Sequence, residues 1–183
     1  MFKKEEIKLK SKEIQLVIFR LRDEEFGADI SSVLEISRML DITHIPEAPG
    51  FIEGVINLRG QVIAVVDLSR KFGLKEEKEL PKTARIVIVE VGPETVGLIV
   101  DEVPEVLRIA EENIESAPEI IQTEIKRDYI KGVGKLGERL VILLDLNKVL
   151  APHEIEQVSR IATTDERRET RDDGRKTTDE ENK

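Results

Sequence analysis

The chain has 183 residues, a formal net charge of −9 and no cysteine. The lack of cysteine excludes disulfides, thiolate zinc sites and thiol catalysis, and the two histidines, His44 and His153, lie too far apart in the sequence to suggest a histidine-rich metal site. The chain is acidic and has no tryptophan and one tyrosine, so it lacks the basic groove and stacking rings of a single-strand nucleic-acid binder. We therefore expect no nucleic-acid partner, no metal and no cofactor.

The N-terminal residues 1–12 mix both signs of charge and lack the apolar core of a signal peptide. Further along, the longest purely apolar runs, residues 62–66 and 140–144, have five residues each, whereas a membrane-spanning helix needs about 20. We expect residues 1–12 to be an N-terminal extension, and the chain to stay in the cytoplasm without inserting into a membrane.

The body of the chain, about residues 13–150, reads mainly as short β-strands rich in β-branched residues and bounded by glycine, proline or charged clusters. The predicted strands are residues 14–21, 54–58, 61–66, 84–91, 95–100 and 139–144. Short helices are expected at Ser31–Ser37, Leu68–Phe72 and Leu146–Leu150, and residues 73–83 are expected to be a polar linker.

The C-terminal part divides into a predicted helix and a charged tail. Within residues 151–162, the residues Ile155, Val158 and Ile161 recur at helical spacing, and Pro152 suits the first turn. Residues 163–183 contain no apolar side chain, and 14 of these 21 residues are charged. Because such a segment cannot bury enough surface to offset its ordering entropy, we expect it to be disordered.

The linker separates two copies of one sequence pattern. Residues 14–38 align with 84–108, and residues 51–72 align with 129–150, with 13 identities in 47 aligned positions. This duplication predicts two similar β-units, the first about 14–72 and the second about 84–150. Since short strands that close into small barrels remove exposed sheet edges, we expect two small SH3- or OB-like barrels that share a core.

Positions that are identical in both copies are predicted to serve the fold. Glycines at such positions suit turns and close backbone approaches, and an aspartate before a short helix can cap its free N–H groups. The pairs in question are Gly27/Gly97, Gly54/Gly132 and Asp67/Asp145.

Polar positions that differ between the copies are better candidates for function. Asn57 corresponds to Lys135, and Arg59 corresponds to Gly137. Arg59 lies at the turn between two predicted strands and should be exposed, where a guanidinium can pair with carboxylates or carbonyls of a partner helix. The alternative is a salt bridge within the barrel.

Residues Phe51–Leu68, with the run Gly-Val-Ile-Asn-Leu-Arg-Gly, closely resemble the signature of the CheW family of chemotaxis adaptors. Residues 26–36 resemble the first block of that family, and residues 129–134 and 141–146 resemble its last. The resemblance covers about residues 13–150 and implies two five-stranded barrels around a shared core. The same module occurs in the kinase CheA and in CheV, but this chain has no room for their additional domains.

The resemblance implies a scaffold that catalyses nothing. CheW-like proteins bind the cytoplasmic tip of chemoreceptors (methyl-accepting chemotaxis proteins) and the regulatory domain of a CheA-type histidine kinase, so the chain is expected to be recruited to membrane receptor arrays. In the family, the residues that match Arg59, Gly54 and Val33 are tied to receptor binding. With Asn57, these form the predicted receptor-binding set, although Val33 read by itself is equally a core residue. The kinase-binding residues are not predicted.

Three alternatives remain open from the sequence. The chain could serve another receptor–kinase pathway, such as pilus motility. It could be a small-barrel protein that binds a ligand or an oligonucleotide, which the acidic charge and the lack of aromatic residues disfavour. It could also be an enzyme, although Ser31, Ser32 and Ser69 have no nearby histidine to activate them and no phosphate-binding glycine loop is present.

Overall fold

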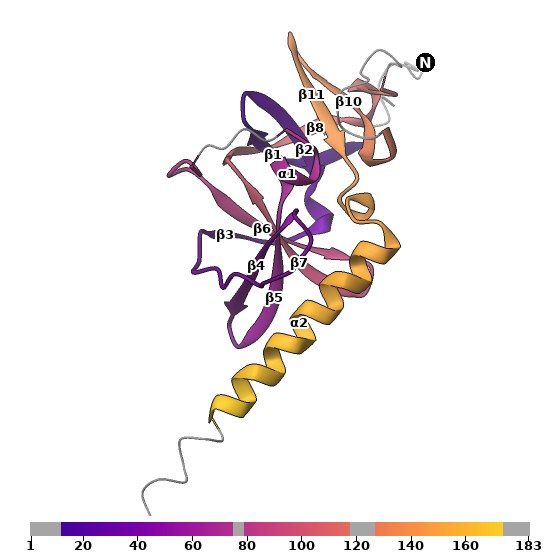
Figure 1. Cartoon of the computed structure of the whole chain (residues 1–183). Helices are drawn as coiled ribbons and strands as arrows, with labels where there is room; N and C mark the ends of the chain where they lie inside the picture. The colour runs from indigo at the N-terminus through magenta and orange to yellow at the C-terminus, as the bar shows by residue number, and fades with distance from the viewer. Residues whose placement is uncertain (1–11, 75–78, 118–126, 174–183) are drawn as a thin grey trace, which may run out of the picture.

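Within residues 12–74, 79–117 and 127–173, which the computed structural model describes, the chain forms two β-sheets and a long C-terminal helix (Figure 1). The strands are β1 (Glu13–Leu21), β2 (Glu24–Asp29), β3 (Val33–Arg38), β4 (Ile52–Leu58), β5 (Gln61–Asp67), β6 (Arg85–Val91), β7 (Glu94–Val100), β8 (Glu102–Ala110), β9 (Ile114–Glu115), β10 (Ile130–Leu136) and β11 (Arg139–Leu144). The helices are α1 (Leu68–Lys71) and α2 (Pro152–Asp173), with 3-10 turns η1 (Ile30–Ser32), η2 (Glu111–Asn113), η3 (Arg127–Tyr129) and η4 (Leu146–Lys148). The prediction of a mainly β fold is confirmed, and the six predicted strands are present to within two residues at each end.

The two sheets have the same internal order. Sheet A runs β8-β1-β2-β11-β10-β9, and sheet B runs β3-β6-β7-β5-β4. In each sheet one neighbouring pair is parallel, β2 with β11 and β5 with β7, and the other neighbours are antiparallel. The alignment of the two sequence copies places β1 on β6, β2 on β7, β3 on β8, β4 on β10 and β5 on β11. Sheets A and B are therefore equivalent, apart from the added two-residue strand β9.

The sheets do not follow the two sequence units. Sheet A combines β1 and β2 of the first copy with β8 to β11 of the second, and sheet B combines β3 to β5 of the first copy with β6 and β7 of the second. The expectation that residues 14–72 and 84–150 each form their own barrel is therefore corrected. Because the copies carry similar strands, the first two strands of one copy can complete the sheet of the other, and this exchange ties the two halves together.

Three hydrophobic clusters make up the core. A large central cluster lies between the sheets and includes Phe19, Phe26, Phe72 and Tyr129. One smaller cluster belongs to sheet B alone and lies around Ile63 and Ile86. Another belongs to sheet A alone and consists of Leu16, Ile18, Ile109, Val141 and Leu143. This arrangement agrees with the predicted shared core between two similar units.

The conserved aspartate pair of the two copies caps short helical segments as predicted. Asp67 Oδ1 accepts a hydrogen bond from the Arg70 N–H at 3.2 Å before α1, and Asp145 Oδ1 accepts one from the Asn147 N–H at 3.1 Å before η4. Both carboxylates therefore satisfy N–H groups that have no partner within the short helix.

The predicted helix Ser31–Ser37 is wrong. Asp29 caps a single turn, η1, by accepting from the Ser31 N–H at 2.9 Å, and the chain then enters β3 at Val33. The exposures of β3 side chains alternate along the strand, which is the period-2 pattern of a strand rather than the 3.6-residue period of a helix. The β-branched residues Val33 and Ile36 favour the extended backbone here.

Helix α2 lies along β5 and β7 and continues past the edge of sheet B (Figure 1). Val158 is buried in the central cluster, with Ile155 and Ile161 packed beside it. The helix extends to Asp173, so the expectation that disorder begins at residue 163 is corrected for residues 163–173. The glutamates and arginines of this stretch are good helix formers. Residues 174–183, as well as 1–11 and linker residues 75–78, lie outside the described part of the chain.

Candidate functional site

Arg59 and Gly60 form the tight turn between β4 and β5. Both residues have positive φ angles, 51° and 86°, which defines the type I′ turn that suits the twist of a two-residue hairpin. The Asn57 Oδ1 accepts a hydrogen bond from the Gly60 N–H at 2.8 Å and closes the turn. A left-handed conformation costs a non-glycine residue about 1 kcal/mol, so Arg59 occupies a position that glycine would occupy with less backbone strain.

The Arg59 side chain forms a salt bridge between the β4–β5 turn and Glu35 of strand β3. Its Nη2 donates to the two Glu35 carboxylate oxygens at 2.6 and 2.7 Å, although β3 and β4 are the outermost strands of this sheet. The Arg59 side chain is 73% exposed, and a solvent-exposed pair of this kind contributes at most about 1 kcal/mol. The salt bridge that the sequence left as an alternative is therefore present, but it is accessible to a partner.

The second copy has an equivalent contact with more partners. Arg139, the first residue of β11, pairs with Glu105 at 2.9 Å and with Glu25 at 2.6 Å, and Glu105 aligns with Glu35. The hydrogen bond from Arg139 holds the pKa of Glu25 below its usual range, and the hydrogen bond to Glu25 raises the pKa of Arg139. Arg139 is thus anchored by two carboxylates, whereas the Arg59 guanidinium has one carboxylate partner among the described residues.

Gly54 and Val33 shape the strands that carry this pair. A Cβ on Gly54 would lie 2.2 Å from the Thr43 carbonyl oxygen, and a Cβ on its counterpart Gly132 would lie 2.6 Å from the Glu115 carbonyl oxygen. Val33 is partly buried and packs against the central cluster, as does its counterpart Val103. The structure therefore places Asn57 and Arg59 at the β4–β5 turn and Val33 on the opposing strand β3, and gives Gly54 a steric role.

Sequence reasoning missed the exposed apolar residues of β3. Leu34 is 55% exposed and Ile36 is 38% exposed, and both alternate with Glu35 along an edge strand. Exposed apolar side chains on an edge strand are typical of a protein-binding surface. The alternating pattern was readable in the sequence, but the prediction of a helix at Ser31–Ser37 hid it.

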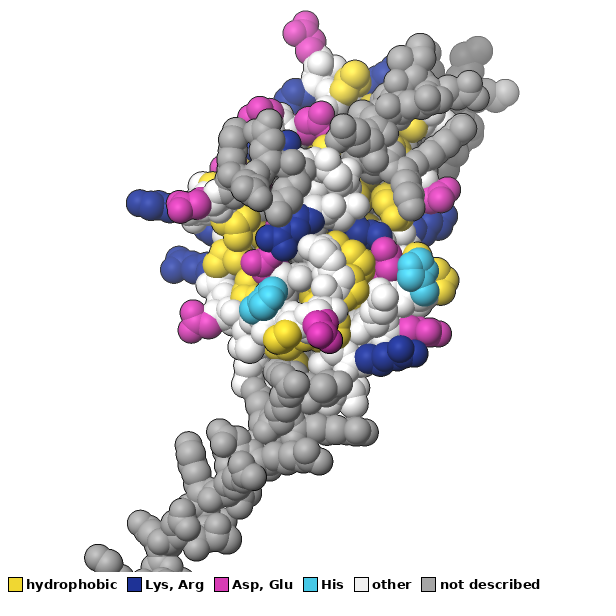
Figure 2. Space-filling model, in the orientation of Figure 1, with side chains coloured by type: hydrophobic (Ala, Val, Ile, Leu, Met, Phe, Trp, Pro, Cys, Tyr) yellow, Lys and Arg dark blue, Asp and Glu magenta, His cyan; other side chains and the backbone are white. Residues whose placement is uncertain are grey.

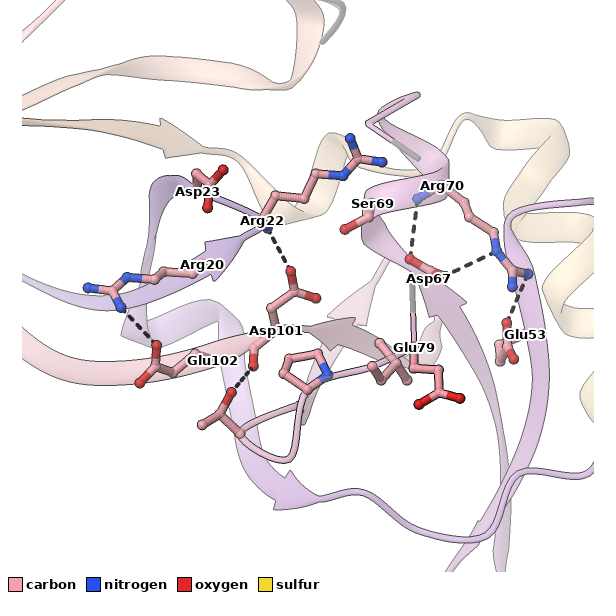
Figure 3. A pocket seen from close by; sticks show the side chains of 13 residues that line it. Arg20, Arg22, Asp23, Glu53, Asp67, Ser69, Arg70, Glu79, Asp101 and Glu102 are labelled. Carbon is pink, nitrogen blue, oxygen red and sulfur yellow. Dashed lines mark hydrogen bonds and ion pairs between the residues drawn. The ribbon is translucent and has the colours of Figure 1, made fainter. Parts of the chain in front are cut away.

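A polar cavity of about 690 Å³ lies elsewhere, between the β1–β2 turn, α1 and the linker (Figure 3). Two of its three arginines are paired with carboxylates: Arg20 pairs with Glu102 at 2.9 Å, and Arg70 pairs with Glu53 at 2.8 Å. None of the four predicted site residues lines it, and its described lining contains no histidine. The cavity lies between the two sheets, and ion pairs form part of its lining. Its described lining offers no nucleophile–base pair.

Basic and acidic side chains are interspersed on the face that Figure 2 shows, and they do not gather into a basic patch. Within the described residues, no group of three or more His, Cys, Asp and Glu side chains is arranged to bind a metal ion. No helix in that same part of the chain is long and apolar enough to span a membrane.

Comparison with known proteins identifies the family. The family model described as CheW-like domain matches residues 15–154. The chain is 37% identical over 148 residues to the chemotaxis protein CheW of Klebsiella aerogenes, covering 81% of this chain and 88% of that protein. It is 34% identical over 152 residues to the chemotaxis protein CheW of Treponema pallidum, covering 81% and 89%. The crystal structure of the scaffolding protein TtCheW from Thermoanaerobacter tengcongensis has a TM-score of 0.69 and 40% identity, covering 76% of this chain and 89% of that one. The sequence blocks, the two equivalent sheets and these relatives together show that the chain belongs to the CheW-like family.

Proposed function

We propose that the chain is a non-catalytic adaptor that couples chemoreceptors to a CheA-type histidine kinase in chemotaxis signal transduction. The observation that carries the proposal is the exposed Arg59–Glu35 pair at a left-handed turn. Strand β3, which carries Glu35, also exposes the apolar side chains of Leu34 and Ile36. Strain at a left-handed non-glycine residue persists where function requires that side chain. The family match and the names of the relatives support the same function.

On the receptor side, Arg59 is the direct contact in this proposal. A carboxylate or a C-terminal carbonyl on the receptor helix would take the guanidinium from Glu35 or share it. Asn57 holds the turn in place by accepting a hydrogen bond from the Gly60 N–H. Gly54 has no Cβ and so leaves room for the Thr43 carbonyl. Val33 packs against the core and so holds β3 in position. These three residues position the arginine.

On the kinase side, the partner is the regulatory domain of the kinase, which has the same fold in this family. The two equivalent sheets offer two related ends for packing against such a domain. Binding at one end leaves the other surfaces free, so one chain can contact receptor and kinase together. The chain would then be recruited from the cytoplasm to receptor arrays at the membrane.

A bridging assay tests this proposal. A receptor signalling-tip fragment is immobilised, and the regulatory domain of the kinase is passed over it with and without the chain. We expect retention of the kinase domain only when the chain is present, and loss of that retention with Arg59→Ala while kinase binding in solution is unchanged. Retention that does not depend on the chain, or failure of the chain to bind either fragment, would refute the adaptor function.

A further inference from the structure

Helix α2 covers one of two equivalent sheet faces. It packs against β5 and β7 of sheet B, where Val62 is 5% exposed and Ala64 is fully buried. The alignment of the two copies places Leu140 of β11 on Val62 and Ile142 on Ala64. On sheet A, however, Leu140 is 63% exposed, the largest exposure among the large apolar side chains in the described part of the chain, and Ile142 is half-buried.

The difference follows from what comes next in the chain. After β11 and η4 the chain enters α2, whose Ile155, Val158 and Ile161 pack on the central cluster. After β5 and α1, the equivalent segment is the linker, and no helix is present in its described residues 72–74 and 79–83. The face of sheet A around Leu140 and Ile142 is therefore equivalent to the face of sheet B that α2 covers. In the described part of the chain, no helix covers the face on sheet A.

We propose that this face, the β11 strip formed by Leu140 and Ile142, binds an amphipathic helix of a partner protein in the way that α2 packs on β5. Apolar positions recurring every three or four residues on that helix would cover the strip, as Ile155, Val158 and Ile161 do on sheet B. This surface belongs to a different sheet from the Arg59 turn, and the proposal does not depend on the proposed function.

The charges around the strip define the flank of the partner helix. Lys135 lies directly opposite Leu140 in the β10–β11 ladder, and its pair with Glu115, at 2.7 Å, is about half-exposed on both sides. Lys131, also on β10, is exposed. The partner helix should therefore carry acidic residues on the side that faces β10, where these two lysines lie.

The first turn of the partner helix should differ from that of α2 in one respect. On sheet B, Lys71 binds Glu154 of α2. The residue that aligns with Lys71 in the second copy is Val149, which is fully buried. The position that glutamate occupies in α2 should therefore be apolar in the partner, because an acid there would find no buried cation.

A peptide titration tests the proposal on the full-length chain. The probe is a synthetic helix of residues 152–163 with Glu154→Leu, stapled by a lactam between the exposed positions 156 and 160 (Arg160→Lys). Methyl-labelled full-length chain is observed by NMR. We expect peptide-dependent shifts at the Leu140 and Ile142 methyls and at least a tenfold loss of affinity in Leu140→Glu. Leu80→Glu, which changes a 44% exposed leucine outside the strip, should bind like the parent.

Other occupants of the strip give distinct results. Shifts confined to β5 methyls such as Val62, or none at millimolar peptide, would overturn the proposal. Leu140 shifts that change on dilution of the chain alone would assign the strip to a second copy. Contacts from residues 1–11 to Leu140 in the free chain would assign it to the N-terminal segment. Either of these last results would also overturn the proposal.

Discussion

The Arg59 guanidinium lies 2.6 Å from the Glu35 carboxylate and joins the two outermost strands of sheet B. Arg139 and Glu105 make the corresponding contact in sheet A at 2.9 Å, although Arg139 comes two positions later in its hairpin than Arg59 does. Both halves thus close their sheets with an arginine from the hairpin and the same aligned glutamate. The Arg59 side chain is more exposed than the Arg139 side chain and has fewer carboxylate partners among the described residues. Arg59 is therefore the arginine that is more available to a binding partner.

Replacing Arg59 separates its functional role from its structural one. Arg59→Ala should change the free energy of unfolding by no more than about 0.5 kcal/mol, because an exposed pair contributes little. Arg59→Gly should be at least as stable as the parent, since glycine adopts a φ of 51° without strain. Both variants should lose receptor-dependent kinase activation. Melting temperatures and kinase assays check this, and a much lower melting temperature or unchanged activation would refute the assignment.

Arg139→Ala is the matched control in the other half. It removes contacts to both Glu25 and Glu105, so we expect it to lower the melting temperature more than Arg59→Ala does. Receptor-dependent activation at saturating protein should stay near the parental level. If Arg139→Ala abolishes activation while the fold is intact, the distinction between the two arginines is wrong.

Gly54→Ala should damage the fold itself. The added Cβ would meet the Thr43 carbonyl at 2.2 Å, and displacing backbone in a packed strand costs about 2 kcal/mol or more. Gly50→Ala is the control, because a Cβ there has nothing within 4 Å. Chemical denaturation of both variants checks the difference. If Gly54→Ala is as stable as the parent, the steric role of Gly54 is wrong, and Gly54 is better explained as a direct contact with the receptor.

The pair that fastens α2 should make stability depend on pH. Lys71 Nζ lies 2.5 Å from Glu154 Oε1, and the Ala151 N–H donates to Glu154 Oε2 at 2.7 Å. Burial acts to raise the pKa of Glu154, but the hydrogen bonds from Lys71 and Ala151 outweigh it and leave the pKa below its usual range. A carboxyl with a lowered pKa stabilises the fold above its unfolded pKa of about 4.3, and this stabilisation is lost as the pH falls through the folded value.

Glu154→Gln measures that contribution. Breaking a largely buried pair should cost about 3 kcal/mol at pH 7, and the variant should lose less stability than the parent between pH 6 and pH 3. Glu25, whose pKa is also lowered, is unchanged in both proteins, so its contribution cancels in the comparison. Parallel pH profiles for the two proteins would contradict the assignment.

Removing residues 163–183 should leave the fold intact. The apolar anchors of α2 that pack on the core, Ile155, Val158 and Ile161, all precede the cut. We expect the melting temperature to change by only a few degrees and binding to the kinase domain to persist. The helical circular dichroism signal should fall, because α2 extends to Asp173. A large drop in melting temperature would show that the removed residues pack against the body.

The sequence predicted local structure better than it predicted pairing. The duplication located equivalent elements correctly, since β4 and β10 begin and end 78 residues apart, which is the offset of the alignment. It did not reveal that β1 and β2 join the sheet of the other copy, because similar strands carry no local signal of which edge they will pair with. Strand β8 was missed because Pro104 and its charged neighbours are atypical of a strand, and such residues are tolerated there because β8 is an edge strand. The Arg59–Glu35 contact depends on the curvature of sheet B, which periodicity does not encode.

The most direct test of the adaptor function is kinase activity in a reconstituted system of receptor signalling tips, the CheA-type kinase and the chain. We predict that kinase activity responds to the receptor only when the chain is added, and that Arg59→Ala abolishes this response although the variant stays folded and still binds the kinase. A receptor response of equal size without the chain, or with Arg59→Ala, would contradict the account.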